Sequence, residues 1–334
     1  MNDTLIDALN GKTHSYVPVW YMRQAGRHMP GFAKYISDVG LSKVIRNPRI
    51  ASEIAAEAVE KLNVDAAIMF SDLITPLEEA GLEYSYEAGP HLKSTFSLNK
   101  FEDASNGISV DDLWFIRDQI MEVRNMVDVP VIGFAGAPFT MASYVIEGMY
   151  VREFPKTKLY MISGNWNRLM DAMLNIIVKD IDVQMGAGAS AVQLFDTWIG
   201  VLSEDQFKKY YYPILSKLIS HIRNKVPVIY FCTDCNHLLK IIGNKVKPTA
   251  LSVDWKTSLR LMHKITKTGL QGNLDPVYAL AGGDTMLREA AAVLKDADRI
   301  NNYVFNLGHG VLPGTDWREL KNLTEYVHKA GQIV

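Results

Sequence analysis

Residues 189–232 read ASAVQLFDTWIGVLSEDQFKKYYYPILSKLISHIRNKVPVIYFC, and this stretch decides the fold class. Ala189–Phe195 and Val226–Cys232 are short, nearly continuous apolar runs, typical of strands buried on both faces. Between them, Ser203 and Gln206 have the spacing of a capping box, and a helical pattern continues to about Asn224. A strand, a helix and a second strand in this order predict one unit of an α/β fold.

The same alternation covers the rest of the chain. Six further runs have the character of strands: Val17–Tyr21, Ala66–Phe70, Val129–Phe134, Ala250–Val253, Leu270–Gly272 and Tyr303–Leu307. Helix signals separate them, including the Asn47-Pro48 cap and a helix that opens at Pro276 and runs to about Asp298. We therefore predict an α/β fold, a single (β/α)8 TIM barrel in which residues 1–334 form one domain. A doubly wound open sheet is the alternative, because sequence does not reveal closure.

The composition excludes several classes of protein. The chain has 334 residues, 35 Lys+Arg against 37 Asp+Glu, and a net charge of −2, which predicts neither a nucleic-acid nor a membrane-surface partner. The N-terminal residues 1–16 are polar, and no run approaches the roughly 20 apolar residues of a membrane span. We expect a soluble, cytoplasmic protein. The two cysteines, Cys232 and Cys235, form a lone CxxC that we interpret as reduced thiols.

Polar and glycine residues follow nearly every predicted strand. In chain order they are Arg23, Gln24 and Arg27; Ser71-Asp72; Gly133–Pro138 with Tyr144; Asp196-Thr197-Trp198; Asp254-Trp255; Gly272-Asn273; and Gly308-His309-Gly310. The loops after the strands of such a barrel converge at one face, where its catalytic groups lie. We therefore expect one site assembled from many loops. The Tyr-, Glu- and Gly-rich segment Leu82–Leu92 is predicted to be an excursion near the barrel mouth.

Six motifs in these loops resemble those of the uroporphyrinogen decarboxylase family, in the family's order and over nearly the whole chain. They are Met22-Arg23-Gln24-Ala25-Gly26-Arg27, Phe70-Ser71-Asp72, Gly136-Ala137-Pro138-Phe139-Thr140, Gln193-Leu194-Phe195-Asp196, Gly272-Asn273-Leu274-Asp275-Pro276 and Asn306-Leu307-Gly308-His309-Gly310. The resemblance implies a barrel enzyme, a carboxy-lyase and usually a homodimer. Its implied reaction is conversion of the four acetate side chains of uroporphyrinogen III to methyl groups, giving coproporphyrinogen III in haem biosynthesis.

The resemblance also implies roles for particular residues. The chemistry needs no cofactor or metal, because protonation of a ring carbon turns the pyrrole into its own electron sink. Arginine grips carboxylates bidentately, and Arg23 and Arg27 share one face if their loop is helical. Asp72 would stabilise positive charge on the ring, and it could also cap a helix before Pro76. The implied catalytic residues are Asp72, Arg23, Arg27, Tyr144 and His309, and the implied substrate contacts add Gln24, Phe134 and Thr197.

The proton donor is left open by the sequence. Arginine has a pKa above about 12 and is a poor general acid, whereas the reference pKa of histidine is near 6.5. His309 and Tyr144 are the candidates. The chain also departs from the family pattern, because the arginines usual after Arg27 are missing and Ile36 stands near one expected place. Lys34 and Arg46 are the candidates to replace them, and Thr197 stands where serine is usual.

Two other functions compete with this interpretation. Zinc-dependent methyltransferases of the same superfamily, which transfer methyl groups from a corrinoid protein to a thiol, carry a His-x-Cys pair after the fifth strand and a later cysteine. Here the equivalent run is Tyr230-Phe231-Cys232 and a third cysteine is absent, so the ligands for zinc are incomplete. A non-catalytic tetrapyrrole-binding protein would need the arginines, but would have no reason to keep Asp72 together with a proton donor.

Overall fold

The centre of the molecule is a curled parallel sheet. The computed structural model describes residues 2–85, 90–93 and 95–332. In this part of the chain the sheet has seven strands in the order β1-β4-β5-β6-β7-β8-β9, so strands adjacent in the sheet follow one another along the chain. The strands are β1 (Ala67–Ile68), β4 (Val131–Gly136), β5 (Ala191–Phe195), β6 (Val228–Phe231), β7 (Ala250–Ser252), β8 (Gly269–Leu274) and β9 (Tyr303–Leu307).

The predicted first strand closes this sheet into a barrel. Val19 forms an isolated parallel bridge with Phe305 of β9, and the Phe305 N–H donates to the carbonyl of Pro18. On the other side, the Asp65 N–H, just before β1, donates to the carbonyl of Val19 at 2.8 Å. The segment therefore joins the two edges of the sheet, although only a bridge and no strand is assigned there. The (β/α)8 prediction is confirmed and the open-sheet alternative is wrong.

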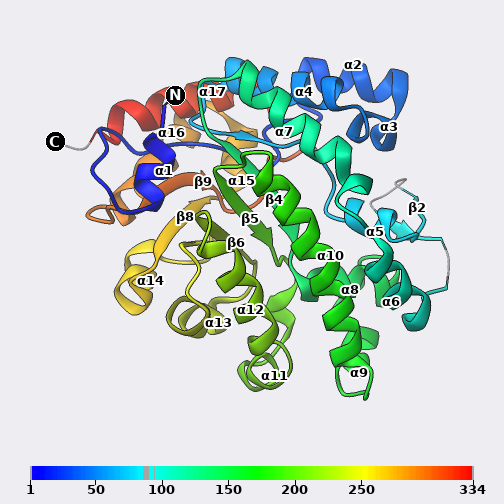
Figure 1. Cartoon of the computed structure of the whole chain (residues 1–334). Coiled ribbons are helices and arrows are strands. Elements are labelled where there is room, and N and C mark those ends of the chain that lie inside the picture. The colour runs from blue at the N-terminus through cyan, green and yellow to red at the C-terminus, as the bar shows by residue number, and fades with distance from the viewer. Residues whose placement is uncertain (1, 86–89, 94, 333–334) are drawn as a thin grey trace.

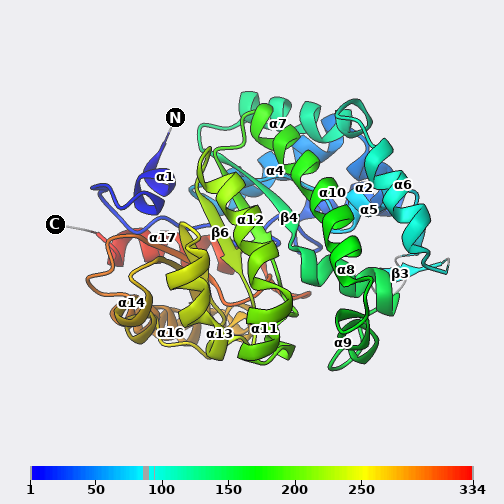
Figure 2. The same cartoon turned by 60° about the horizontal axis from the view of Figure 1, so that its bottom comes forward.

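Helices cover the outside of the barrel (Figure 1), and the turned view shows α7, α10 and α12 across its outer surface (Figure 2). An outer helix follows each barrel segment, as the alternating pattern predicts, and these helices range from 6 to 21 residues. These helices are α4 (Pro48–Leu62), α7 (Trp114–Met126), α10 (Trp166–Gly186), α12 (Tyr212–Arg223), α13 (Asn236–Ile241), α14 (Leu259–Thr266), α16 (Gly283–Asp296) and α17 (Trp317–Ala330). None of the described helices is both long and apolar enough to cross a membrane.

Further helices occupy the connections. They are α1 (Thr4–Leu9), α2 (Pro30–Val39), α3 (Leu41–Ile45), α5 (Thr75–Glu79), α6 (Leu98–Gly107), α8 (Pro138–Glu147), α9 (Pro155–Met161), α11 (Glu204–Tyr210) and α15 (Pro276–Ala281), with single turns at Asp111–Leu113, Ile199–Val201 and Ile242–Val246. Asn47 caps α4 as predicted, with its side chain accepting from the Ile50 N–H.

Two helices that the sequence predicts as continuous are interrupted. The capping box of Ser203 and Gln206 is present, but α11 ends at Tyr210 and α12 begins at Tyr212, because Pro213 cannot continue the hydrogen-bonding of the preceding turn. The helix that opens at Pro276 ends at Ala281, and Gly282 takes a φ of 67° before α16 begins. The positive φ at Gly282 breaks the helical path.

The segment Leu82–Leu92 forms a small antiparallel hairpin in its described part. β2 (Tyr84–Ser85) pairs with β3 (His91–Leu92), while residues 86–89 lie outside the described residues. The Leu92 N–H donates to the carbonyl of Gly148, directly after α8. The hairpin is thereby attached beside the helix that carries Tyr144, as expected for an excursion near the barrel mouth.

Candidate active site

Arg23 and Arg27 lie in the loop after the first barrel segment. Both side chains are exposed, and neither makes a hydrogen bond or ion pair within the described residues. The loop consists of turns and α2 begins only at Pro30, so the helical loop that would place the two arginines on one face is not formed. Arg23 has a φ of 63°, a conformation that costs free energy for a residue with a side chain and that often occurs at functional sites.

The side chain of Arg23 passes over Gly310. A Cβ added at Gly310 would lie 2.5 Å from Cδ of Arg23, so only glycine leaves room for the arginine there. The charge of Arg23 lowers the pKa values of three groups from different loops. It opposes the rise that burial causes in Asp72 and Tyr144, and it adds to the fall that burial causes in His309. The structure thus places Asp72, Tyr144 and His309, three of the residues predicted from the sequence, within electrostatic range of the Arg23 guanidinium.

Asp72 follows β1 and is partly buried. Burial raises the pKa of its carboxyl group, and the nearby Glu78 raises it further, while the Ile74 N–H and Arg23 oppose the shift. Its Oδ1 accepts from the Ile74 N–H at 3.2 Å in the turn that leads into α5. No side chain among the described residues donates a hydrogen bond to Asp72. Asp72 does not cap α5, whose N-cap residue is Ile74, so the helix-cap alternative is wrong; the carboxylate instead holds the preceding turn, which is compatible with a role toward a ligand.

Tyr144 projects from α8 into an aromatic cluster. Its ring centroid lies 4.4 Å from that of Trp198. Phe154 stacks on Trp198, with the two ring centroids 4.6 Å apart. Burial raises the pKa of Tyr144 to about 12, and Asp72 contributes to this shift. The hydroxyl makes no hydrogen bond within the described residues. At neutral pH it is therefore a protonated donor without an acceptor in the part of the chain that the structure describes.

His309 is held as a neutral imidazole. Burial and the charge of Arg23 lower the pKa of His309 to about 4, against a smaller opposite effect of Asp254. Its Nδ1 accepts from the Gly310 N–H at 2.7 Å, which places the ring proton on Nε2. His309 can therefore donate a hydrogen bond through Nε2–H. As a general acid it would be almost fully deprotonated at pH 7, in contrast to what its reference pKa suggests.

A row of phenylalanines leads from Phe134 to His309. The ring centroids are 5.7 Å apart for Phe134 and Phe195, 5.7 Å for Phe195 and Phe231, and 5.8 Å for Phe231 and His309. The sequence predicted Phe134 alone. Phe195 and Phe231 are paired in register on β5 and β6, near the ends of their strands. Register across a barrel is not visible in one sequence, so this apolar row could only be found in the structure.

Thr197, Gln24 and Asp196 differ in how far they are available to a ligand. Thr197 is partly exposed, and its carbonyl accepts from the Thr233 hydroxyl. Gln24 is fully buried, and its amide bonds the Tyr21 N–H and the Ala66 carbonyl, which fixes the arginine loop to the start of β1.

Asp196 is also fully buried and accepts from Thr140, Tyr211 and Tyr230. It ties the loop after β5 to α8. Tyr230, at the position where the methyltransferases carry histidine, is thus engaged with a carboxylate.

The cysteine pair departs from the expectation of free thiols. Cys232 and Cys235 are joined by a disulfide, because the turn after β6, with Asp234 at a φ of 52°, brings the two side chains together. Both cysteines are buried. Within the described residues, no group of three or more His, Cys, Asp or Glu is arranged to hold a metal ion.

Arg46 and Lys34, the candidates to replace the missing arginines, differ in their surroundings. Arg46 pairs with Glu79 at 2.6 Å and with Glu78 at 3.3 Å, so its charge is already shared by two carboxylates of α5. Lys34 is exposed on α2, with its ammonium 6.0 Å from the ring of Tyr35. Of the two, only Lys34 is without a carboxylate partner among the described residues.

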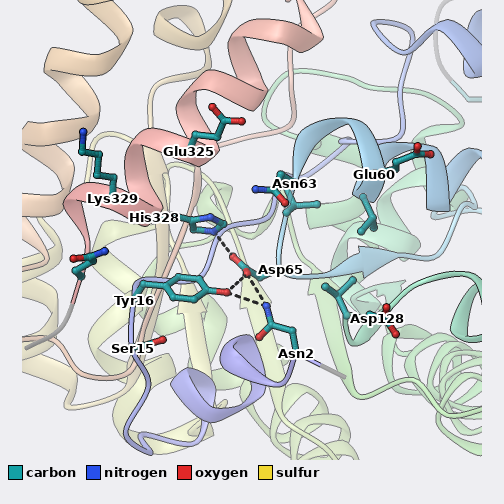
Figure 3. Close-up of a pocket in the computed structure, with 14 residues that line it drawn as sticks. Asn2, Ser15, Tyr16, Glu60, Asn63, Asp65, Asp128, Glu325, His328 and Lys329 are labelled. Atoms are coloured by element: carbon teal, nitrogen blue, oxygen red, sulfur yellow. Dashed lines mark hydrogen bonds and ion pairs between the residues drawn. The ribbon is translucent and has the colours of Figure 1, made fainter.

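A hollow of about 810 Å³ lies at the opposite end of the barrel, where the strands begin (Figure 3). At its centre, Asp65 accepts from the Val19 N–H, the Tyr16 hydroxyl and Asn2, and pairs with His328 at 2.7 Å. Every oxygen of Asp65 is engaged with protein. In barrel enzymes this face serves stability, and the chemistry lies at the other face.

The fold and the polar residues at one end of its strands define the class of protein, a (β/α)8 barrel with a ligand-facing rim built from its βα loops. The chain belongs to the uroporphyrinogen decarboxylase family, since the model of the family described as "Uroporphyrinogen decarboxylase (URO-D)" matches residues 1–330.

Relatives named uroporphyrinogen decarboxylase support this assignment. The protein of Thermodesulfovibrio yellowstonii is 35% identical over 98% of this chain and 98% of its own length. Those of Halalkalibacterium halodurans and Bacillus subtilis are each 34% identical, over 98% and 99% of this chain and 97% and 96% of their own lengths.

Solved structures agree on the fold. A methyltransferase from Methanosarcina mazei superposes with a TM-score of 0.81 over 98% of each chain, at 21% sequence identity. A B12-independent methionine synthase from Shewanella sp. W3-18-1 gives a TM-score of 0.60 over 86% of this chain and 88% of its own, at 11% identity. At these identities the likeness shows the barrel and does not extend to the reaction.

Proposed function

We propose that this protein decarboxylates uroporphyrinogen III, converting its four acetate side chains to methyl groups and giving coproporphyrinogen III. The observation that carries the proposal is the action of one cation, Arg23, on the charges of Asp72, Tyr144 and His309, which follow different strands of the barrel. The family membership supplies the substrate. Each acetate loses CO₂ and gains one proton, so each turnover consumes one proton and releases one CO₂.

The reaction divides into three tasks for the protein. Arg23 and Arg27, exposed and without carboxylate partners among the described residues, bind substrate carboxylates. Asp72 faces the pyrrole N–H groups and stabilises the ring when protonation of a ring carbon makes it cationic. The C–C bond to the carboxylate then breaks, with its electron pair flowing into that ring, and CO₂ leaves. The exocyclic methylene that remains takes up a proton to become the methyl group, and the ring carbon loses the proton that it had received. We propose that no cofactor takes part.

The neutral groups supply orientation. Tyr144 and the Nε2–H of His309 both donate hydrogen bonds at neutral pH, and substrate carboxylates or the leaving CO₂ are suitable acceptors. Phe134 and Phe195, which are partly exposed and backed by the buried Phe231, offer an apolar face for pyrrole rings, and Thr197 is a further proposed substrate contact. Neither Tyr144 nor His309 is charged at pH 7, so the proton reaches the ring carbon from a group or water that they position.

The direct test is anaerobic incubation of metal-free protein with uroporphyrinogen III, followed by oxidation and separation of products by carboxyl number. Successive seven-, six-, five- and four-carboxyl products would support the proposal, and addition of a chelator should leave the rate unchanged. Inhibition by chelator that zinc restores would contradict the cofactor-free reaction. Substrate that binds but stays unchanged would favour a tetrapyrrole carrier.

Asp72→Asn tests the assigned mechanism. We expect kcat to fall on the order of 100-fold while substrate affinity changes little, because the carboxylate acts on charge that develops in the transition state. Asp298→Asn, which removes an exposed carboxylate elsewhere, is the control. Loss of affinity with an unchanged chemical step would contradict the role of Asp72.

The remaining properties follow from the family resemblance. We propose that residues 1–334 act as one domain, that the protein works in the cytoplasm, and that two copies form a homodimer. Light scattering of the purified protein across a concentration series tests the dimer, which predicts twice the 37.5 kDa chain mass.

A further inference from the structure

Tyr84 has a buried hydroxyl group that nothing in the described protein satisfies. The side chain is 6% exposed, and its oxygen is shielded from solvent yet has no hydrogen-bond partner. A buried polar group without a partner costs free energy. Such a group in a native structure calls for an explanation, and one explanation is a partner that arrives with the substrate.

The position of Tyr84 points to the active site. It begins β2, whose partner strand β3 is bonded to the end of α8 through the Leu92 N–H and the Gly148 carbonyl. α8 carries Tyr144. Tyr84 lies close enough to Glu78, Tyr144 and Asp72 for all three to act on the electrostatics of its hydroxyl. The orphan donor therefore lies within electrostatic range of two residues of the proposed site.

The group best suited to accept from Tyr84 is Asp72. Glu78 already receives Arg46 at Oε2 and shares its charge with that guanidinium, and Tyr144 is itself a protonated donor. Asp72 receives no side-chain hydrogen bond within the described chain, and the cation that supports its charge is Arg23. A substrate carboxylate that binds Arg23 takes part of that support away, which leaves the Asp72 carboxylate in need of another donor.

We propose that Tyr84 is a positioning residue of the active site, whose hydroxyl donates to Asp72 when substrate occupies Arg23. A phenol O–H that bonds a carboxylate favours the ionised form. Tyr84 thereby keeps Asp72 anionic and aimed at the pyrrole N–H groups while positive charge develops on the ring. The inference rests on the proposed decarboxylase function and adds a residue from the hairpin to it.

Burial and the Ile74 N–H act most strongly on the ionisation of Asp72, and four side chains surround it in this arrangement. Arg23, from the loop after the first barrel segment, favours the anion, and Glu78 of α5 disfavours it. Tyr144 of α8 and Tyr84 of β2 are neutral neighbours that can donate. Removal of the Tyr84 oxygen should therefore raise the pKa of Asp72 in the substrate complex and move the acid limb of kcat to higher pH.

Tyr84→Phe separates this role from a structural one. Because the oxygen has no partner in the free protein, the variant should unfold at the same temperature as wild type or higher. Its kcat should fall on the order of 10-fold, as for loss of a group that orients a catalytic residue, with KM nearly unchanged. Tyr303→Phe is the matched control, because the Tyr303 hydroxyl donates to the Gly272 carbonyl. It should lower the melting temperature and leave the acid limb in place.

The outcomes are distinct. Tyr84→Phe with wild-type kcat and an unmoved acid limb would overturn the inference, as would a lowered melting temperature with unchanged kcat per folded molecule. If wild-type protein does not decarboxylate uroporphyrinogen III, the proposed function fails and this inference fails with it. Normal wild-type turnover with an unaffected Tyr84→Phe variant would remove Tyr84 alone.

Discussion

Arg27 is an exposed cation in a loop whose other arginine already contacts the proposed site, and it has no carboxylate partner among the described residues. Arg27→Ala should therefore weaken substrate binding by about 10-fold or more, the effect of losing one charge-assisted hydrogen bond. Arg299→Ala, at an exposed site before β9, is the control. Binding titrations measure the effect, and equal affinity of the two variants would place Arg27 outside the site.

His309 is predicted to act through a neutral Nε2–H. Because burial and Arg23 lower the pKa of His309 to about 4, the ring should stay uncharged across the working pH range and contribute no limb to kcat near neutrality. His309→Gln retains an N–H donor and should keep more activity than His309→Ala. We expect losses of about 10-fold and about 100-fold respectively. Equal losses, measured as kcat, would instead indicate proton transfer by the imidazole.

At the scale of elements, the sequence predicted what depends on local pattern. The apolar runs predicted as strands are segments of the barrel, and the predicted caps at Asn47 and Ser203 are present. Both features depend on residues that are close together in the sequence. The family motifs then indicated Asp72, Arg23 and His309. Contacts between elements were not visible, so the phenylalanine row, the engagement of Gln24 with backbone and the disulfide required the structure.

The short strand β1 shows how elements compensate for one another. β1 pairs with β4 only at Val131 and Ile132, which leaves the Phe134 carbonyl without a strand partner on that side. Gln184 of α10 donates to this carbonyl at 2.8 Å, and Asp180 accepts from the same amide at 3.0 Å. The other Asp180 oxygen is buried without a partner. Gln184 thus supplies the hydrogen bond that β1 does not make to β4. Asp180, which orients the Gln184 amide, keeps one buried oxygen without a partner among the described residues.

Asp180 should make stability depend on pH. Burial raises its pKa to about 7, against 3.8 for the free group, so its contribution to stability is fully present below pH 3.8 and is lost as pH rises through about 7. The loss is on the order of 4 kcal/mol at most. Asp180→Asn should therefore exceed wild type in unfolding free energy above pH 7, with the difference shrinking toward pH 4. Denaturant titrations across this range measure it.

The exposed Asp171 on the same helix provides the control for that experiment. Asp171→Asn should follow the wild-type pH dependence, because an exposed carboxylate loses little solvation on folding. A variant Asp180→Asn that tracks wild type at every pH would mean that the carboxyl group is ionised in the native state.

At the scale of the whole molecule, the two ends of the barrel have different tasks. The carboxyl ends of the strands carry unpartnered donors and cations, whereas the amino ends carry a satisfied network around Asp65 (Figure 3). That network joins Tyr16, before the first barrel segment, to His328 of α17, the last helix. The buried carboxylate therefore fastens both ends of the chain to the point where the barrel closes.

Asp65→Ala should destabilise the fold without altering the chemistry. It leaves the Val19 N–H and the Tyr16 hydroxyl without their acceptor and breaks the pair with His328, a loss of about 3 kcal/mol in unfolding free energy. Because the barrel mouth is untouched, kcat per folded molecule should equal that of wild type. Asp128→Ala is the control, since Asp128 lines the same hollow but its side chain makes no hydrogen bond within the described residues. A fall in kcat that exceeds the loss of folded protein would show that closure of the barrel at Val19 also governs the geometry of the loop that begins three residues later at Met22.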